Sequence, residues 1–391
     1  MNSVERLVYL DYAATTPVDP QVNETMSALI DETGDFANPS AIHAAGRRSG
    51  AHVARAAAQL ASLLNTQPER FVWTSGATES NNLAILGAAR HREHRGRHLI
   101  TMLTEHKAVI DVFRALERQG FDVTWLKPDE RGVLDIAVLQ AAMRDDTQLV
   151  SIMHVNNETG VLQDIGRIGE CCREHDVLLH VDAAQSVGKL PIDLASLDVD
   201  LVSMTAHKLY GPKGIGALYI ADRPGVHIEP IMFGGGQQRR LRPGTLAVPL
   251  IAGFGQAADI ASDRIPDDLK HLTRLRSKLW DGIREIPGVQ LNGDLETSYP
   301  GLLNVSVDDI EGESLLLALE PLCVATGSAC NSHNQDPSYV LRALGRSDSE
   351  AQSAIRFSLG RPTRPSDIKF AISQYQNAVA KLRAMAPDRA A

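Results

Sequence analysis

The chain has 391 residues, of which 43% are hydrophobic and 22% are charged. This composition is typical of soluble globular proteins and excludes a disordered or fibrous chain. A chain of 391 residues is longer than one hydrophobic core usually supports, so we expect two domains or one large unit with an added lobe. The 39 basic and 48 acidic residues give a formal charge of −9, which argues against a dominant nucleic-acid or anionic-membrane surface.

The sequence contains no run of roughly eighteen apolar residues, and its start, MNSVERLVYLDYA, lacks the basic and apolar regions of a signal peptide. We therefore expect a cytoplasmic protein that makes no membrane contact. The cysteines are Cys171, Cys172, Cys323 and Cys330. The first two are adjacent and the other two lie far away in the sequence. This spacing favours neither a disulfide framework nor a metal site.

From about residue 70 to 220, short apolar or β-branched runs alternate with amphipathic helical stretches. This alternation predicts an α/β domain with a mostly parallel sheet wrapped by helices. Several runs are apolar on both faces, as expected for strands that helices cover on both sides. The predicted strands are FVWT, HLITM, DVTWL, LVSIMHV, VLLHVDA, LVSMTA and GALYI.

Regular β-α alternation ends after these runs. Helical periodicity resumes near Pro249, and beyond Pro287 predicted strands (VQLNG, GLLNVSVDDI) mix with predicted helices. This change predicts a smaller α+β domain. We expect a large domain at residues 15–260 and a small domain made of residues 1–14 and 261–391.

Small and polar residues follow several predicted strands, where open α/β sheets place their ligand clefts. The turn at residues 74–80 can aim backbone N–H groups at a phosphate, with Thr78 adding a hydroxyl. A plain strand-to-helix turn with a cap would look similar. Asp182 follows the run VLLHV, and an acid there needs a cation or hydrogen-bond donors. A pyridinium nitrogen would serve, as in pyridoxal-phosphate sites, but an Asp that caps the next helix also fits.

Two further residues, a lysine and a cysteine, could form covalent bonds with a cofactor or a substrate. Lys208 follows the predicted strand LVSM, and a lysine at the mouth of an α/β sheet can form a Schiff base with an aldehyde cofactor. Lys213, in the glycine-rich loop that follows, is the competing lysine. Cys330 lies in ATGSACN, whose small and polar residues favour an exposed, reactive thiol. Cys323, in LCV, fits a buried structural cysteine instead.

Ten motifs follow one another along nearly the whole chain: LDYAATTPVDP at Leu10, NPSAIH at Asn38, TSGATESNN at Thr74, TEHKAV at Thr104, MHVNNETG at Met153, HVDAAQ at His180, TAHKLYGPKG at Thr205, RPGTLAV at Arg242, ATGSAC at Ala325 and IRFSLGR at Ile355. Together these motifs resemble those of the NifS/IscS-like cysteine desulfurases. These are class V members of the aspartate-aminotransferase fold. The resemblance implies a fold-type-I α/β protein that has a mostly parallel, mixed seven-stranded sheet and a smaller α+β domain.

The resemblance implies a role for each matching position. Lys208 would bind pyridoxal 5′-phosphate as a Schiff base, and His106 would stack on the ring and assist proton transfer. Asp182 would pair with the pyridinium nitrogen and keep it protonated, which strengthens the ring as an electron sink. Gln185 would hydrogen-bond the phenolic oxygen. The residues implied to contact the phosphate are Ala77, Thr78, Thr205, His207 and, from the other subunit of a homodimer, Thr245.

Asn157 and Arg356 would bind the substrate carboxylate, for which a planar guanidinium is well suited. Cys330 would take the sulfur of L-cysteine as a persulfide, leaving L-alanine, and would pass it to an acceptor protein. The G-S-A-C form places the chain with the group I desulfurases. Viewed in isolation, Arg356 would also fit a surface or salt-bridged arginine, and His106 a satisfied polar residue.

Two departures from the family pattern leave the acceptor open. Residues 331–336 replace a Ser/Thr/Ala-rich stretch, and His333 there fits either a group that tunes the thiol or an exposed loop histidine. The chain also ends soon after Met385, short of the longer tail with which housekeeping members bind their scaffold. The acceptor could be an iron–sulfur scaffold, a sulfur carrier for tRNA or cofactor thiolation, or a DNA-sulfur-modification partner.

Other functions fit part of the pattern. A selenocysteine lyase or another class V aminotransferase would keep Lys208 and Asp182 but would not need Cys330. An assembly subunit with a vestigial site would need none of the three. Against a vestigial site, the full set of implied cofactor and substrate residues is present.

Overall fold

The computed structural model describes residues 7–326 and 336–385. Its central element is a seven-stranded sheet with the order β2-β8-β7-β6-β5-β3-β4. β8 is antiparallel to both of its neighbours, and the remaining adjacent pairs are parallel. This confirms the predicted mixed, mostly parallel α/β sheet. The strands are β2 (Phe71–Thr74), β3 (His98–Met102), β4 (Asp122–Leu126), β5 (Thr147–Met153), β6 (Leu178–Asp182), β7 (Leu201–Thr205) and β8 (Gly216–Ile220).

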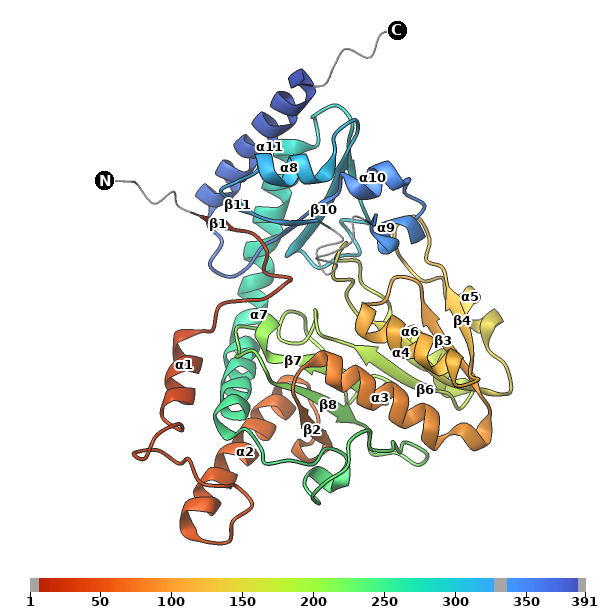
Figure 1. Cartoon of the computed structure of the whole chain (residues 1–391), viewed down its shortest axis with the longest axis vertical. Helices are drawn as coiled ribbons and strands as arrows, with labels where there is room; N and C mark the ends of the chain where they lie inside the picture. The colour runs from red at the N-terminus through yellow and green to blue at the C-terminus, as the bar shows by residue number, and fades with distance from the viewer. Residues whose placement is uncertain (1–6, 327–335, 386–391) are drawn as a thin grey trace.

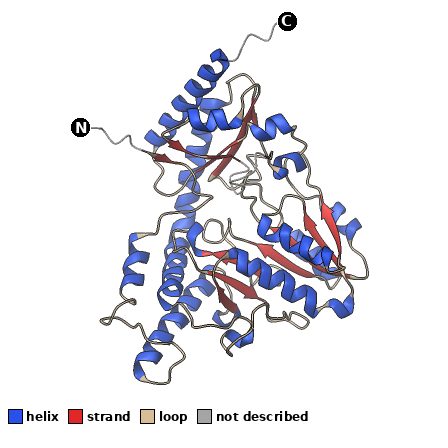
Figure 2. Ribbon diagram, in the orientation of Figure 1, coloured by secondary structure: helices blue, strands red, loops and turns tan. Residues whose placement is uncertain are grey.

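Helices cover both faces of this sheet (Figure 2), which explains why β5, β6 and β7 are buried along their whole length. Leu99 and Leu149 belong to the core on one face, while the next residues, Ile100 and Val150, belong to the core on the other. Side chains alternate between the faces because successive residues of a strand point in opposite directions. One core is covered by α3 (Ala77–His91) and α4 (Lys107–Arg118), the other by α2 (Ala44–Leu63), α5 (Ile136–Ala142) and α6 (Ile165–Glu174).

A second, antiparallel sheet has the order β12-β13-β10-β9. It packs against helices around its own hydrophobic core (Figure 1). A short parallel pair, β1 with β11, lies next to it. These elements are β1 (Val8–Tyr9), β9 (Val289–Leu291), β10 (Leu302–Val307), β11 (Leu322–Cys323), β12 (Ala325–Thr326), β13 (Ile355–Ser358), α8 (Gly312–Ala318), α9 (Tyr339–Ala343), α10 (Asp348–Gln352) and α11 (Pro365–Met385).

One long helix, α7 (Val248–Ile283), connects the two sheets and runs vertically in Figure 1. Its first half, with Ile251 and Phe254, packs into a core of the large sheet, and its second half, with Leu272 and Leu279, packs into the core of the small sheet. The predicted domain boundary at residues 260 and 261 falls inside this helix. The division at these residues therefore stays a prediction.

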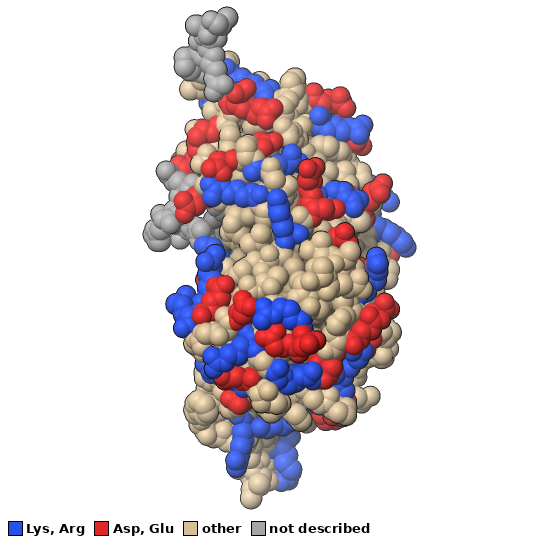
Figure 3. Space-filling model, turned by 90° about the vertical axis from the view of Figure 1, so that its right-hand side faces the viewer, with Lys and Arg blue, Asp and Glu red and all other residues tan. Residues whose placement is uncertain are grey.

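The remaining elements are short or precede the large sheet. They are α1 (Pro20–Ser27) and the 3-10 turns η1 (Pro68–Arg70), η2 (Glu93–Arg95), η3 (Ala206–Lys208) and η4 (Gln238–Arg240). Across the described residues, every helix is too short or too polar to cross a lipid bilayer. On the face in Figure 3, acidic and basic side chains are interspersed, so no extended surface of one sign covers it.

Candidate functional site

A cavity of about 610 Å³ lies at the carboxyl ends of β6 and β7 and extends to the small sheet. It brings together residues from motifs that lie far apart in the sequence. Thr245 does not line this cavity, and Cys330 lies outside the described residues. The predicted site residues that line the cavity are Ala77, Thr78, His106, Asn157, Asp182, Gln185, Thr205, His207, Lys208 and Arg356.

At one end of the cavity, α3 begins without a side-chain cap. Its N-cap residue is Gly76, whose φ of 156° and ψ of 178° suit glycine alone. Gly216 of β8 lies so close behind that a Cβ on it would be 2.6 Å from the Cα of Gly76. The first N–H groups of the helix, at Ala77 and Thr78, therefore face a cavity that suits an anion, because helix N-termini carry partial positive charge.

His207 lies on the same side of the cavity, and its Nδ1 is 3.1 Å from Thr15 Oγ1. Burial lowers the pKa of His207 to about 4, and the positive charges of Lys208, Lys213 and Lys189 add to this shift. The imidazole is therefore neutral at pH 7, and the exposed Lys213 supplies positive charge beside it. Such surroundings favour an anionic ligand.

Asp182 ends β6 and is buried. Asn81 Nδ2 donates to Asp182 Oδ2 at 2.7 Å, and the Ala184 N–H donates to Oδ1 at 2.9 Å. These donors compensate the burial of the carboxylate and fix its orientation. The segment that follows Asp182 is a series of turns rather than a helix, so the structure does not support a helix-capping role.

Both the nitrogen and the oxygen of the Gln185 side-chain amide make hydrogen bonds. Its Nε2 donates to Ala13 O at 2.8 Å, and its Oε1 accepts from Lys189 Nζ at 2.8 Å. One N–H of Nε2 is left for another acceptor. Burial lowers the pKa of Lys189 well below its usual range, and the charges of Lys208 and Arg356 lower it further. The Gln185 amide is therefore anchored in one orientation.

His106 is the N-cap of α4, and its Nδ1 accepts the N–H of Ala108 at 3.1 Å. The proton of the neutral ring therefore sits on Nε2. Burial lowers the pKa of His106, so the ring is neutral at pH 7. The preceding Glu105 is fully buried, accepts the N–H of Met153, and has a pKa raised well above its usual range by burial and by Asp182.

Lys208 ends the short turn η3 directly after β7 and lines the cavity together with Lys213. The two lysines differ in their surroundings. Lys213 is exposed, whereas Lys208 is half-buried and also borders a second, smaller cavity behind the site. Lys208 is therefore the more enclosed of the two lysines.

Arg356 lies on β13 and is buried. Its Nη1 donates to Asn157 O at 2.8 Å, and its Nη2 pairs with Asp11 Oδ1 at 2.8 Å. The Nε of Arg356 and the Oδ1 of Asn157 are buried without a hydrogen-bond partner among the described residues. Buried polar groups are rarely left so in proteins, which indicates a polar ligand at this end of the cavity.

Residues 327–335 lie outside the described part of the chain, but both of their flanks are fixed near the cavity. Ala325 of β12 pairs with Arg356 of β13. On the other side, Ser338 Oγ donates to Glu158 Oε2 at 2.5 Å, and burial raises the pKa of Glu158 to about 7. Glu158 directly follows a residue that lines the cavity.

Asp11, Asn81 and Lys189 are among the polar residues of the site that were not predicted from the sequence. Asp11 pairs with Arg356, and Asn81 anchors Asp182. Both lie inside motifs that carry the family resemblance, so each could have been singled out. Lys189 had no such signal, because nothing in the sequence distinguishes it from a surface lysine.

The family model for class-V aminotransferases matches residues 8–370. The chain is 54% identical to "Cysteine desulfurase IscS" of Enterobacter sp. (strain 638) over 381 residues, which cover 97% of this chain and 94% of that protein. A solved "NifS-like protein" superposes with a TM-score of 0.90 at 36% identity, covering 96% of this chain and all of the other.

A second solved structure, "SspA in complex with cysteine", superposes with a TM-score of 0.80 at 37% identity. It covers 90% of this chain and 98% of the other. A family model that matches most of the chain, together with relatives this similar over nearly its full length, identifies the family. The protein belongs to the class-V aminotransferase family and, within it, to the cysteine desulfurases.

Proposed function

We propose that the protein is a pyridoxal-phosphate-dependent cysteine desulfurase that converts L-cysteine into L-alanine. It passes the sulfur, through a persulfide on Cys330, to an acceptor protein for iron–sulfur clusters or for sulfur modification of cofactors or nucleic acids. The observation that carries the proposal is that Lys208, Asp182 and Arg356 meet in one cavity. The relatives named cysteine desulfurase, and the relative solved with cysteine, support the substrate.

The residues that line the cavity fit both the phosphate and the ring nitrogen of pyridoxal phosphate. The uncapped start of α3, with Thr78, Thr205 and His207 nearby, offers donors to a phosphate. The anchored carboxylate of Asp182 provides the negative charge that a ring nitrogen needs to stay protonated. When bound, the cofactor supplies an aldehyde that condenses with amines and a cationic ring that takes up electrons from the substrate.

The remaining residues bind the substrate or move protons. Lys208 Nζ would hold the cofactor by its aldehyde, and the same amine would accept and return the α-proton of the substrate. His106 carries its proton on Nε2, where it can assist this transfer. Arg356 Nε has no protein partner among the described residues and would donate to the substrate carboxylate, beside Asn157.

Cys330 is the proposed nucleophile that takes the sulfur from the substrate. Its thiolate attacks the sulfur of the substrate, so that an S–S bond forms while the C–S bond of the substrate breaks. The electron pair stays with the carbon, which takes up a proton, and the amino acid leaves as alanine. The fixed flanks of residues 327–335, at Ala325 and Ser338, support an approach of Cys330 to the cavity.

The function is tested by turnover. Protein loaded with pyridoxal phosphate should form alanine from L-cysteine, with one sulfur recovered per alanine on reduction. Arg356→Lys should raise the KM for cysteine by roughly 10 to 100-fold, because a lysine cannot keep the contacts to Asn157 O and Asp11 while it donates to the carboxylate. Formation of pyruvate in place of alanine, or an unchanged KM in the variant, would contradict the proposed reaction or the proposed carboxylate site respectively.

A homodimer would complete the phosphate site. Thr245 is exposed and lines a separate hollow beside Ile30 and Phe36, each of which is 63% exposed. Apolar side chains exposed in a cluster indicate a protein contact. We propose that a second copy covers this hollow and that Thr245 then reaches the phosphate of its partner.

Light scattering is expected to show a dimer, and Phe36→Asp should shift the protein toward monomer by placing a charge in an apolar contact. The monomer should bind pyridoxal phosphate more weakly, because it lacks the contact from Thr245. Thr78→Asp, inside the cavity, is the matched control: it should weaken cofactor binding and leave the dimer intact. A monomeric wild-type protein would refute the dimer.

A further inference from the structure

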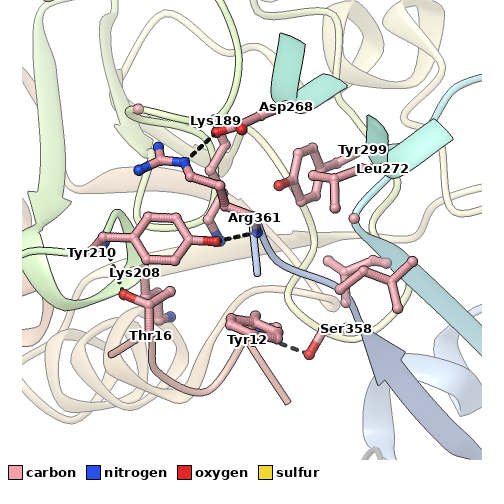
Figure 4. A pocket seen from close by; sticks show the side chains of 15 residues that line it. Tyr12, Thr16, Lys189, Lys208, Tyr210, Asp268, Leu272, Tyr299, Ser358 and Arg361 are labelled. Carbon is pink, nitrogen blue, oxygen red and sulfur yellow. Dashed lines mark hydrogen bonds and ion pairs between the residues drawn. The ribbon is translucent and has the colours of Figure 1, made fainter. Parts of the chain in front are cut away.

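A second cavity, of about 20 Å³, lies behind Lys208 between the large and the small sheet (Figure 4). It is large enough for about one water molecule. Lys208 lines this cavity as well as the large one. Tyr210 and Arg361 also line it, the former from the turn after β7 and the latter from the segment after β13. This cavity is therefore where the lysine-bearing turn meets the small sheet.

Tyr210 has an unusual backbone conformation. Its φ is +66°, in the left-handed region, which is strained for a residue with a bulky side chain. Its N–H donates to Thr16 Oγ1 at 2.8 Å, and its carbonyl accepts the N–H of Asp19 at 2.9 Å. Because Tyr210 is two residues from Lys208, this conformation sets the course of the chain that carries the lysine. Strain of this kind persists only where the surroundings enforce it.

Arg361 contacts the Tyr210 side chain at two points. The centre of its guanidinium lies 4.4 Å from the ring centroid, and its backbone N–H donates to the phenolic oxygen at 2.6 Å. The guanidinium is itself fixed, since its Nε donates to Asp268 Oδ2 of α7 at 2.9 Å. Figure 4 shows Arg361 beside the Tyr210 side chain, with both hydrogen bonds of Arg361 drawn.

We propose that Arg361 is a positioning residue for Lys208 and acts through Tyr210. It holds the strained turn in place, so that the Lys208 amine is presented to the cofactor without reorganisation. Arg361 follows β13, the strand of Arg356, so the same contact would keep the lysine and the substrate-binding arginine in register across the two sheets. This inference rests on the proposed role of Lys208 as the residue that binds the cofactor.

The test is the binding of pyridoxal phosphate to cofactor-free protein, followed by the imine absorbance of Lys208. Arg361→Met, which keeps side-chain length but removes the planar cation, should weaken binding and slow imine formation by roughly tenfold, because misplaced groups lose pre-organisation. The pH at which the imine band titrates should also shift. A purely structural role would lower the melting temperature and leave both imine measurements unchanged.

Arg346→Met is the matched control. Arg346 is also partly buried and also makes two hydrogen bonds, to Gln290 and to Leu291 O, but it does not line either cavity. Its variant should bind the cofactor as the unchanged protein does.

Tyr210→Phe removes only the hydroxyl, and it provides an alternative test if Arg361→Met does not fold. It should shift binding in the same direction by a smaller factor. If Tyr210→Phe and any folded Arg361 variant bind the cofactor within about twofold of wild type, a factor worth about 0.4 kcal/mol, Arg361 does not position Lys208. If Lys208→Ala keeps the imine band, the proposed function has failed, and this result is distinguishable from a failure of the inference.

Discussion

Replacing Lys208 with alanine is expected to abolish the imine absorbance of the bound cofactor and to lower cysteine turnover by at least about a thousandfold. The physical reason is that the variant loses both the amine that holds the cofactor and the base for the substrate α-proton. Borohydride reduction of the unchanged protein should attach the cofactor covalently to the peptide that contains Lys208. The same treatment should leave the variant unlabelled.

Lys213→Ala is the control for this prediction, because Lys213 lines the same cavity from a more exposed position. That variant should keep the imine band and the reductive label, even if the loss of a positive charge weakens phosphate binding. A label on the peptide of Lys213, or an imine band that survives in Lys208→Ala, would reverse the assignment of the two lysines. A protein without any imine band would favour an assembly subunit with a vestigial site.

Replacing Cys330 with alanine should leave cofactor binding intact and reduce the formation of alanine from cysteine by at least about a hundredfold. Without a thiolate to accept the sulfur, the C–S bond of the substrate has no route to break by sulfur transfer. The measurements are the imine band, the rate of alanine formation, and the mass of the protein after one turnover. The unchanged protein should gain one sulfur atom, and the variant should gain none.

Cys323 supplies the control for the sulfur step. It lies in β11, a short distance before residues 327–335, and burial raises the pKa of its thiol. A thiol with a raised pKa is a poor nucleophile at neutral pH, so Cys323→Ala should retain turnover and the added sulfur. If Cys330→Ala still turned over cysteine, the persulfide mechanism would be wrong. Selective retention of activity toward selenocysteine would favour a selenocysteine lyase.

The fold could be predicted from the sequence to a large extent. The runs FVWT, HLITM, DVTWL and GALYI coincide with β2, β3, β4 and β8. Apolar strands between amphipathic helices can be recognised locally, because each short apolar run by itself indicates a strand that is buried on both faces. The helices α1 and α2 were not predicted, because they precede the β-α alternation on which the prediction rested.

Within the site, the sequence identified the chemical groups but not their partners. Ten predicted residues line one cavity, whereas the pairs Asp11 with Arg356 and Lys189 with Gln185 emerged only from the structure. The first pair joins residues 345 positions apart in the sequence, and the second depends on how the flexible side chain of Lys189 packs. The roles assigned to the lining residues, and the place of Cys330, stay predictions that the experiments above test.

The sequence by itself determined the fold class and the family, and it predicted the lysine, acid and arginine on which the proposed chemistry depends. These features depend on residue types and on short-range patterns, which a linear sequence records. The tertiary structure decided which groups are buried, how the Asp182 carboxylate is anchored, and how Arg361 contacts Tyr210 behind Lys208. Contacts of this kind join segments more than a hundred residues apart, and their geometry is fixed only when the two sheets pack around α7.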